Sequence, residues 1–173
     1  MSGRPPQVAV VGGGKAEADL LELAEDVGRR LAVAGAVLVC GGRGGVMEAA
    51  SRGASGAGGV VIGILPGLSP AEANEHVSHT VATGVGHARN LAVVASGDAV
   101  IAIGGEWGTL SEIALARRLG RPVVALRSWT LQNDGVSELG INEAEGPEDA
   151  VARALDAARG TARSPDRGRD PVD

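Results

Sequence analysis

A glycine-rich loop followed by a predicted helix is the clearest sign of chemistry in this sequence. The segment GGEWGT at residues 104–109 follows an apolar run and precedes a stretch with helical character. A helix amino terminus presents unpaired N–H groups and a partial positive charge, and glycines let a phosphate approach that backbone closely. We therefore expect Gly104, Gly105, Gly108 and Thr109 to bind a phosphate group. The alternative is that these glycines only make a tight strand-to-helix turn.

Two charged residues, Arg89 and Glu112, lie near this loop in the predicted arrangement of strands and helices. Glu112 comes one helical turn after Thr109, and Arg89 lies early in the preceding predicted helix. An arginine can clamp a phosphate or a ribose, whereas a carboxylate can position water or stabilise positive charge on a sugar ring. We expect Arg89 and Glu112 to be the catalytic residues if the protein is an enzyme. A surface ion pair is the alternative reading of the same two residues.

Two further glycine loops follow apolar runs in the same way. Gly12 and Gly13 end the first run, and a cluster that contains Gly42, Arg43 and Gly44 follows the second. Loops of this kind lie at the carboxyl edge of a parallel sheet, where open α/β folds bind their ligands. We expect these five residues to contact the same phosphorylated small molecule as the third loop.

Several common chemistries do not fit. Glu17 stands where the dinucleotide fingerprint needs its third glycine, and the second strand ends in Cys40 rather than an acidic ribose ligand. The sequence has no GxxxxGK[ST] run, which argues against a P-loop nucleotidase. His76, His79 and His87 lack a nearby thiol partner. We therefore expect neither a metal nor a bound cofactor.

The elements that must position these residues alternate along the chain. Strands are predicted at residues 7–11, 36–40, 59–65, 77–82, 98–103 and 123–126, and helices at 20–31, 46–55, 86–95, 107–119 and 148–158. Short connections between them imply a parallel sheet with right-handed crossovers and helices on both faces. The prediction is a single α/β domain, residues 1–159, with a Rossmann-like, doubly wound parallel sheet. Residues 160–173, rich in Arg, Asp, Pro and Gly, are predicted to be a disordered tail.

Composition narrows the classes of partner. The chain has 173 residues, of which 44% are hydrophobic, and a formal net charge of -5. This charge, without a local basic patch, argues against nucleic acid as a partner. No apolar run reaches the roughly 18 residues of a membrane span, and the single cysteine, Cys40, cannot form an internal disulfide. We expect a cytoplasmic protein with no membrane partner.

Three segments resemble one known family. The Lonely Guy family, once labelled lysine decarboxylases, has the hallmark PGGxGTxxE, which is similar to residues 103–112 with Ile103 in place of the proline. The family's arginine within a short histidine-containing segment resembles Arg89 in residues 86–90. The glycine run before Met47 is similar to the family's third element, although Arg43 interrupts it. With these departures, the chain resembles a divergent branch of the family, near the molybdenum cofactor carrier proteins.

The resemblance implies a phosphoribohydrolase that binds a nucleoside 5'-monophosphate and cleaves its N-glycosidic bond. It places the catalytic roles on Arg89 and Glu112, and it implies a homo-oligomer, a dimer or larger. The alternative is a carrier that binds the molybdenum cofactor, or another phosphorylated pterin or nucleotide, without turning it over. Lysine decarboxylation is not expected, because a pyridoxal phosphate enzyme needs a Schiff-base lysine and only Lys15 is present.

Overall fold

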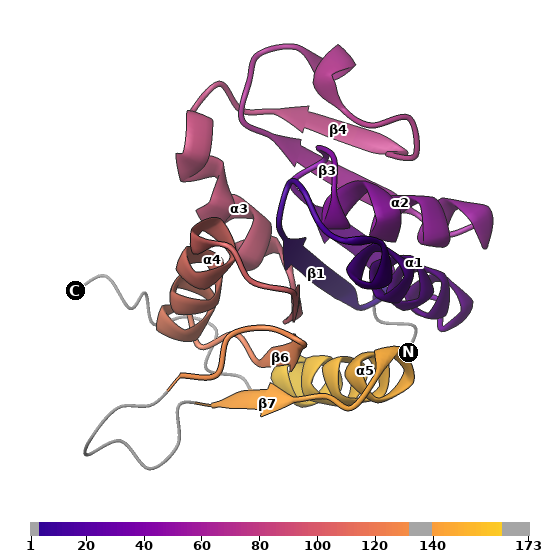
Figure 1. Ribbon diagram of the computed structural model, residues 1–173, viewed down its shortest axis with the longest axis vertical. Coiled ribbons are helices and arrows are strands. Elements are labelled where there is room, and N and C mark those ends of the chain that lie inside the picture. Colours follow the sequence, from indigo (N-terminus) through magenta and orange to yellow (C-terminus); the bar gives the residue numbers. More distant parts are fainter. Residues whose placement is uncertain (1–3, 132–139, 164–173) are drawn as a thin grey trace.

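The structure is a computed structural model that describes residues 4–131 and 140–163. Its strands and helices alternate along most of the chain (Figure 1). The strands are β1 Gln7–Gly12, β2 Val37–Cys40, β3 Val61–Leu65, β4 His79–Ala82, β5 Ala99–Ile103, β6 Val123–Leu126 and β7 Ile141–Glu143. The helices are α1 Ala18–Val33, α2 Val46–Gly56, α3 Arg89–Ser96, α4 Trp107–Arg118 and α5 Pro147–Arg163, with 3-10 turns at Pro70–Glu72 and Gly86–Ala88.

The described strands form one seven-stranded sheet in the order β4-β3-β2-β1-β5-β6-β7. Every neighbouring pair is parallel, with Val8 opposite both Leu38 on β2 and Ala99 on β5. The direction in which strands are added reverses between β1 and β5. In doubly wound folds this reversal opens a crevice at the carboxyl ends of the two strands, which is where ligands bind.

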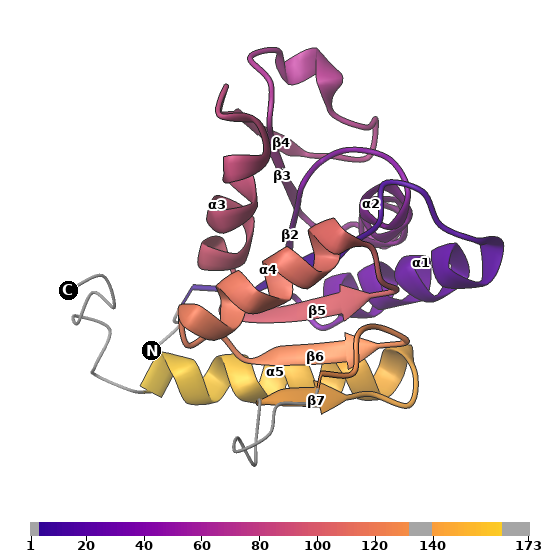
Figure 2. The same ribbon diagram turned by 60° about the vertical axis from the view of Figure 1, so that its left-hand side comes forward.

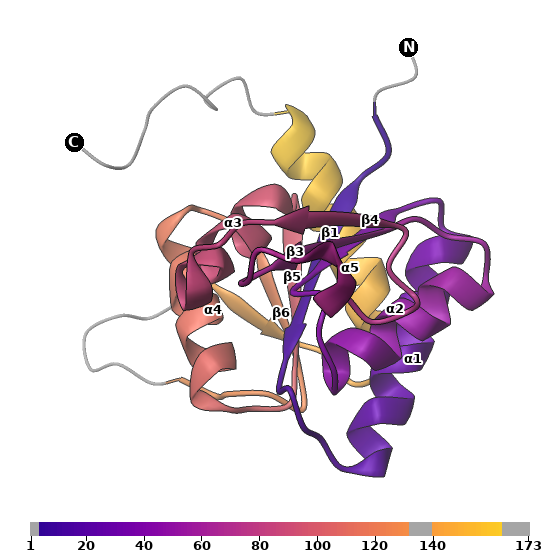
Figure 3. The same cartoon turned by 90° about the horizontal axis from the view of Figure 1, so that it is seen from above.

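Helices cover both faces of the sheet. Figures 2 and 3 show α3 and α4 on one side of the sheet and α1, α2 and α5 on the other. β5 has the sequence AVIAI and all of its residues are buried, as a central strand covered on both faces requires. Alternate β5 residues therefore enter different core clusters: Ile101 and Ile103 pack towards α1, α2 and α5, while Val100 packs towards α3 and α4.

Close helix packing explains some of the glycines. A Cβ added at Gly28 on α1 would lie 1.9 Å from the Ala50 carbonyl oxygen, and one at Gly53 on α2 would lie 1.9 Å from the Glu25 carbonyl oxygen. α1 and α2 can approach each other only because both positions lack a side chain. This contact keeps the first two glycine loops side by side, and the Val46 N–H at the start of α2 donates a hydrogen bond of 3.0 Å to the Gly13 carbonyl.

The predicted α/β, Rossmann-like, doubly wound parallel sheet is confirmed, and all six predicted strands are present. The sequence missed β7, a three-residue edge strand. It also ended the last helix too early, because α5 continues past Ala158 to Arg163 and the domain boundary predicted at residue 159 falls inside it. The helix continues through Gly160, because a glycine costs a helix only about 1 kcal/mol. Residues 164–173 of the predicted tail lie outside the described residues.

Candidate ligand-binding site at the sheet's carboxyl edge

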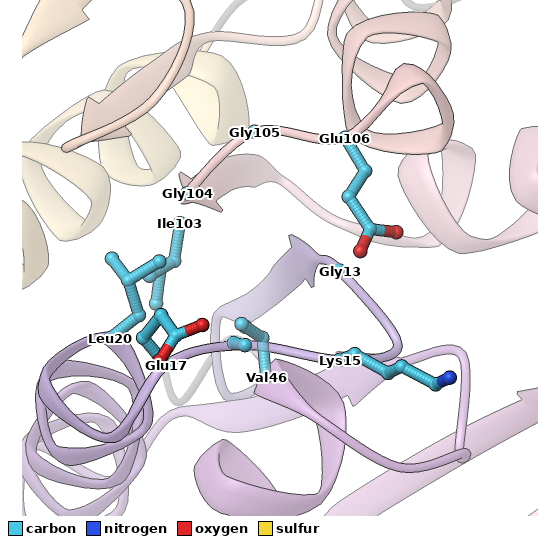
Figure 4. A pocket seen from close by; sticks show the side chains of 10 residues that line it. Gly13, Lys15, Glu17, Leu20, Val46, Ile103, Gly104, Gly105 and Glu106 are labelled. Carbon is cyan, nitrogen blue, oxygen red and sulfur yellow. The ribbon is translucent and has the colours of Figure 1, made fainter.

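A pocket of about 370 Å³ opens where β1 and β5 end (Figure 4). Its lining comes from the β1–α1 loop, the first turn of α1, the start of α2, the end of β5 and the β5–α4 loop: Gly13, Lys15, Ala16, Glu17, Leu20, Val46, Ile103, Gly104, Gly105 and Glu106. The first and third glycine loops therefore meet here, as predicted from the topology. The pocket occupies the crevice where the strand order reverses.

The charges of this lining do not suit a phosphate. Two carboxylates, Glu17 and Glu106, share it with one ammonium group, that of Lys15. The Glu106 side chain points towards Gly13, where an added Cβ would be 3.0 Å from Glu106 Oε1 (Figure 4). A phosphate beside these carboxylates would be repelled, whereas N–H donors of a ligand would find acceptors.

The amino terminus of α4 offers the opposite chemistry. The Glu106 side chain makes no capping hydrogen bond to this terminus, which leaves the N–H groups of the first turn without a side-chain acceptor. Gly108 is exposed, and a Cβ added there would meet no atom within 4 Å. An anion can therefore reach the backbone of the first turn from open solvent.

Thr109 adds an unpaired hydroxyl to this terminus. The residue is only 1% exposed, and its Oγ1 has no hydrogen-bond partner among the residues that the structure describes. Leaving a buried hydroxyl unpaired costs on the order of 1 to 3 kcal/mol. A ligand oxygen at the start of α4 would remove this cost.

Arg89 and Glu112 lie opposite each other. Arg89 is the first residue of α3, and its Nη1 lies 3.9 Å from Glu112 Oε1 on α4. Both side chains are nearly buried, 10% and 9% exposed, so the pair is not the surface ion pair that the sequence left open. Thr109 and Glu112, three residues apart, lie on one face of α4.

The guanidinium of Arg89 keeps free donor capacity. Its Nη1 donates a hydrogen bond of 2.8 Å to Asn90 Oδ1, and its Nε has no partner within the described part of the chain. A Cβ added at Gly41 would lie 2.4 Å from Nη1, so the guanidinium rests directly on this glycine. Arg89 Nη1 and Glu112 Oε1, 3.9 Å apart, form an ion pair without a hydrogen bond. Donors of Arg89 therefore remain for a ligand at this edge.

Burial sets the protonation of this pair. Desolvation raises the pKa of Glu112 from 4.5 to about 7, and the positive charge of Arg89 opposes the rise without cancelling it. Desolvation likewise lowers the pKa of Arg89, against the attraction of Glu112. Burial raises the pKa of the Cys40 thiol, which makes this cysteine a poor nucleophile.

The Arg43 residue of the second glycine loop already has partners within the protein. The Arg43 guanidinium pairs with Glu72 in the loop after β3, at 2.7 Å, and the Arg43 carbonyl accepts a hydrogen bond from Asn74. Gly42 has a φ of +69°, and Gly44 lies beside it in the same loop. A role in ligand binding for Gly42, Arg43 and Gly44 stays a prediction.

Gly12 has a packing role. A Cβ added at this position would lie 2.5 Å from Val46 Cγ1 and 2.7 Å from the Ile103 carbonyl oxygen. The end of β1 can therefore approach α2 and β5 only with glycine at residue 12. Its predicted contact with a ligand stays a prediction.

Sequence reasoning missed three parts of this site. Gly41 supports Arg89, but only Gly42, Arg43 and Gly44 were selected from its cluster. Trp129, in the segment after β6, lies against Gly105, and no role was predicted for it from the sequence. The chain has only two tryptophans and no Phe or Tyr, and this rarity could have drawn attention to Trp129. The inward turn of Glu106 towards Gly13 could not be inferred from spacing.

Two absences hold for the residues that the structure describes. Within residues 4–131 and 140–163, no three or more His, Cys, Asp or Glu side chains gather in a way that could hold a metal ion. Over the same residues, no helix has the length and apolar character needed to cross a membrane.

Comparisons with known proteins identify the family. The model of the SLOG cluster4 family matches residues 5–154. The chain belongs to the SLOG cluster4 family. An uncharacterized protein from Archaeoglobus fulgidus is 40% identical over 145 residues, which make up 84% of this chain and 91% of that protein.

Solved structures place this SLOG cluster4 protein beside the molybdenum cofactor carriers. The molybdenum cofactor binding protein from the phototrophic bacterium Rippkaea orientalis matches with a TM-score of 0.83 and 38% identity, covering 90% of this chain and 98% of that one. The molybdenum cofactor carrier protein from Chlamydomonas reinhardtii matches with a TM-score of 0.79 and 32% identity, covering 90% and 99%. The predicted position near these carriers is confirmed.

The glycine loop of this SLOG cluster4 chain departs from the Lonely Guy hallmark. In PGGxGTxxE one residue separates GG from GT, whereas here two residues, Glu106 and Trp107, separate them. Treating residues 103–112 as a direct match overlooked this extra residue. It places Trp107 as the first residue of α4 and leaves Glu106 free to face Gly13. The start of the helix is therefore built differently from the hallmark on which the catalytic roles were inferred.

Proposed function

We propose that this protein is a carrier that binds a phosphorylated pterin, the molybdenum cofactor or a close relative, without turning it over. The observation that carries the proposal is the amino terminus of α4. Its open first turn and the buried, unpaired hydroxyl of Thr109 form an anion site, and the spare donors of Arg89 on the facing helix reinforce it. The phosphate of the ligand binds there.

The likeness to the Rippkaea and Chlamydomonas proteins supports the choice of ligand. Both are described as binding or carrying the molybdenum cofactor, and each is covered almost completely by this chain. The carrier was the alternative at the level of sequence. The altered spacing of the glycine loop now favours it over hydrolysis.

Calorimetric titration with the phosphate ester of 6-hydroxymethylpterin tests the anion site. Thr109→Val keeps the shape of the side chain and removes its hydroxyl, so we expect weaker binding together with unchanged or increased stability. Thr130→Val is the matched control, because Thr130 is exposed and bonded to Glu143. Equal affinity of the wild-type protein and Thr109→Val would contradict the proposed position of the phosphate.

Arg89→Ala removes the guanidinium and is expected to weaken binding as well. Arg118→Ala, an exposed arginine on α4, is its control. A phosphate clamp by Arg89 requires that the first variant loses affinity and that the second does not. If both variants bind like the wild-type protein, Arg89 does not contact the ligand.

A phosphoribohydrolase is the second candidate, and the buried pair of Arg89 and Glu112 favours it. A carboxyl group with a pKa of about 7 is suited to general acid–base catalysis near neutral pH. In this reaction water attacks the anomeric carbon of a nucleoside 5'-monophosphate as the N-glycosidic bond breaks. The products are the free base and ribose 5-phosphate. Glu112 would stabilise the oxocarbenium-like sugar, and Arg89 would hold the ribose or phosphate.

Incubation with a panel of nucleoside 5'-monophosphates, followed by chromatography, decides between the two functions. For a hydrolase, Glu112→Gln should abolish turnover and spare binding, whereas Arg89→Ala should weaken both. The loss of one transition-state contact lowers the rate about a hundredfold to a thousandfold, which an endpoint assay resolves easily. Tight binding of the pterin phosphate with no free base from any nucleotide establishes the carrier.

A further inference from the structure

The two aromatic residues of this chain lie together at the third glycine loop. The sequence contains two tryptophans and neither phenylalanine nor tyrosine. Trp107 is the first residue of α4, and Trp129 follows β6. Their ring centroids are 5.5 Å apart, with the rings tilted by 36°. The whole aromatic surface of the protein is therefore gathered at the carboxyl edge of the sheet.

Trp129 is fixed in place by the loop itself. Its Nε1 donates a hydrogen bond of 3.3 Å to the Glu106 carbonyl, and the indole covers Gly105, where a Cβ would lie 3.0 Å from Nε1. Trp129 is therefore held against the glycine loop through both its polar and its apolar atoms.

The chain reaches Trp129 through a strained residue. Arg127 has a φ of +49°, a conformation that non-glycine residues seldom adopt. Its guanidinium pairs with Asp19 of α1 at 2.6 Å, which anchors the turn from the other side of the sheet edge. This turn, with its strained residue, leads the chain from β6 to Trp129, whose indole contacts that of Trp107.

Trp107 itself is not used by the core. It is 78% exposed, while the core consists of aliphatic and alanine side chains. Trp107 precedes Thr109 by two residues in the sequence. It therefore stands at the helix terminus where the phosphate of the ligand is proposed to bind. The neighbouring pocket has no aromatic lining residue, whereas the indole of Trp107 is exposed at the helix terminus.

We propose that Trp107 is a stacking surface for the ring of the ligand, which is therefore a planar bicyclic heteroaromatic joined to a phosphate. This inference rests on the proposed binding of the phosphate at the start of α4. An indole face stacks on purine and pterin rings through dispersion and the arrangement of π charge. Trp129 holds this face in one orientation, and Thr109 holds the phosphate beside it.

Titration calorimetry with matched ligands tests the proposal. The phosphate ester of 6-hydroxymethylpterin carries ring and phosphate, guanosine 5'-monophosphate replaces the pterin by a purine, and glycerol 3-phosphate has no ring. We expect Trp107→Ala to weaken binding of the pterin ester about tenfold or more, since base stacking on one aromatic side chain contributes about that much. Trp107→Phe should retain most of the affinity, and glycerol 3-phosphate should bind both variants like the wild-type protein.

Leu68→Ala is the control, because Leu68 is an equally exposed apolar residue, 83% exposed, in the loop after β3. It should change none of the affinities. Unchanged binding of both the pterin ester and guanosine 5'-monophosphate to Trp107→Ala overturns the proposal, as does equal weakening of the pterin ester and glycerol 3-phosphate. A change of molecular mass in light scattering with full affinity would show that Trp107 contacts another subunit, and it also overturns the proposal.

Failure of the stacking surface and failure of the proposed function give different results. If Thr109→Val weakens binding and Trp107→Ala does not, the carrier function stands and only the stacking surface is lost. If the wild-type protein binds neither the pterin ester nor guanosine 5'-monophosphate, both proposals are wrong. If guanosine 5'-monophosphate alone depends on Trp107, stacking stands and the ligand is a nucleotide.

Discussion

The titration of Glu112 makes the fold itself dependent on pH. Its side chain is 9% exposed, and burial raises its pKa from 4.5 to about 7 although Arg89 lies 3.9 Å away. The folded protein therefore holds a proton on Glu112 over a range of pH in which the unfolded chain has released it. Stability gained in this way is complete below pH 4.5 and is lost as the pH rises through 7.

The size of the effect follows from the shift. One pKa unit corresponds to about 1.4 kcal/mol, so a rise from 4.5 to about 7 amounts to about 3 kcal/mol of unfolding free energy. This is a large part of the roughly 5 to 15 kcal/mol that stabilises an ordinary domain. Glu112→Gln resembles the protonated carboxyl group at every pH. The variant should match the wild-type protein most closely in acid and exceed it by about 3 kcal/mol above pH 7.5.

Urea unfolding of the two proteins from pH 4 to pH 8 measures this difference. Other titrating groups contribute equally to both proteins and cancel in the comparison. Glu25→Gln serves as a control of opposite sign, because the Arg52 side chain lowers the pKa of Glu25. Its carboxylate contributes stability at neutral pH that is lost as the pH falls through the acid range.

Parallel stability curves for the wild-type protein and Glu112→Gln would refute this reasoning. They would mean that Glu112 titrates alike in the folded and the unfolded chain, so that neither its burial nor its proximity to Arg89 acts as described. The test is therefore the change of the difference with pH. A pH-independent offset added to that change leaves the reasoning intact, because the substitution also changes the pairing of Arg89, which stays protonated throughout this range.

Four further predictions follow from the packing and the proposed site. Gly28→Ala should destabilise the protein by about 1 to 3 kcal/mol in urea unfolding, because its Cβ would lie 1.9 Å from a backbone oxygen of α2, whereas Gly56→Ala, with open space around it, should be neutral or stabilising. Gly108→Ala should fold normally and bind pterin phosphate more weakly in calorimetry, because its methyl group partly covers the α4 terminus; unchanged affinity would place the phosphate elsewhere. Asp98→Ala should cost about 1 to 3 kcal/mol in thermal unfolding, since Asp98 accepts two hydrogen bonds from Arg4, and an unchanged melting temperature would show that this pair does not hold the start of β1. Light scattering at micromolar concentration should show a dimer or larger assembly, and a monomer would reject this prediction.

Most of the sheet could be predicted because its strands are short apolar runs, three of which, β1, β2 and β5, end at or lead into glycine. β5 and its glycine loop are an example, since a buried run of five residues leads directly into Gly104. β7 gave no such signal, because Ile141–Glu143 is a three-residue edge strand with one apolar side chain. Edge strands are paired on one side only, so their sequences need not be apolar.

The candidate site was predictable in its topology and not in its side-chain pairings. Convergence of the loops follows from the parallel order of the strands, and with it the approach of Arg89 to Glu112. The partner of Arg43 was not predictable, because Glu72 comes from a loop whose path depends on tertiary contacts. The inward turn of Glu106 depends in the same way on the close approach of Gly13.

The extra residue in the β5–α4 loop connects these observations. It gives the loop two consecutive side chains, Glu106 directed at the pocket and Trp107 exposed at the start of α4. The loop therefore presents a carboxylate acceptor to the pocket, and an exposed indole together with the helix N–H groups at the start of α4. Such an arrangement suits the proposed ligand, which has both a ring and an anion. A hydrolase must also bring a water molecule and a catalytic carboxyl group to the anomeric carbon of the sugar. Holding the ligand requires neither, which is why the geometry favours a carrier.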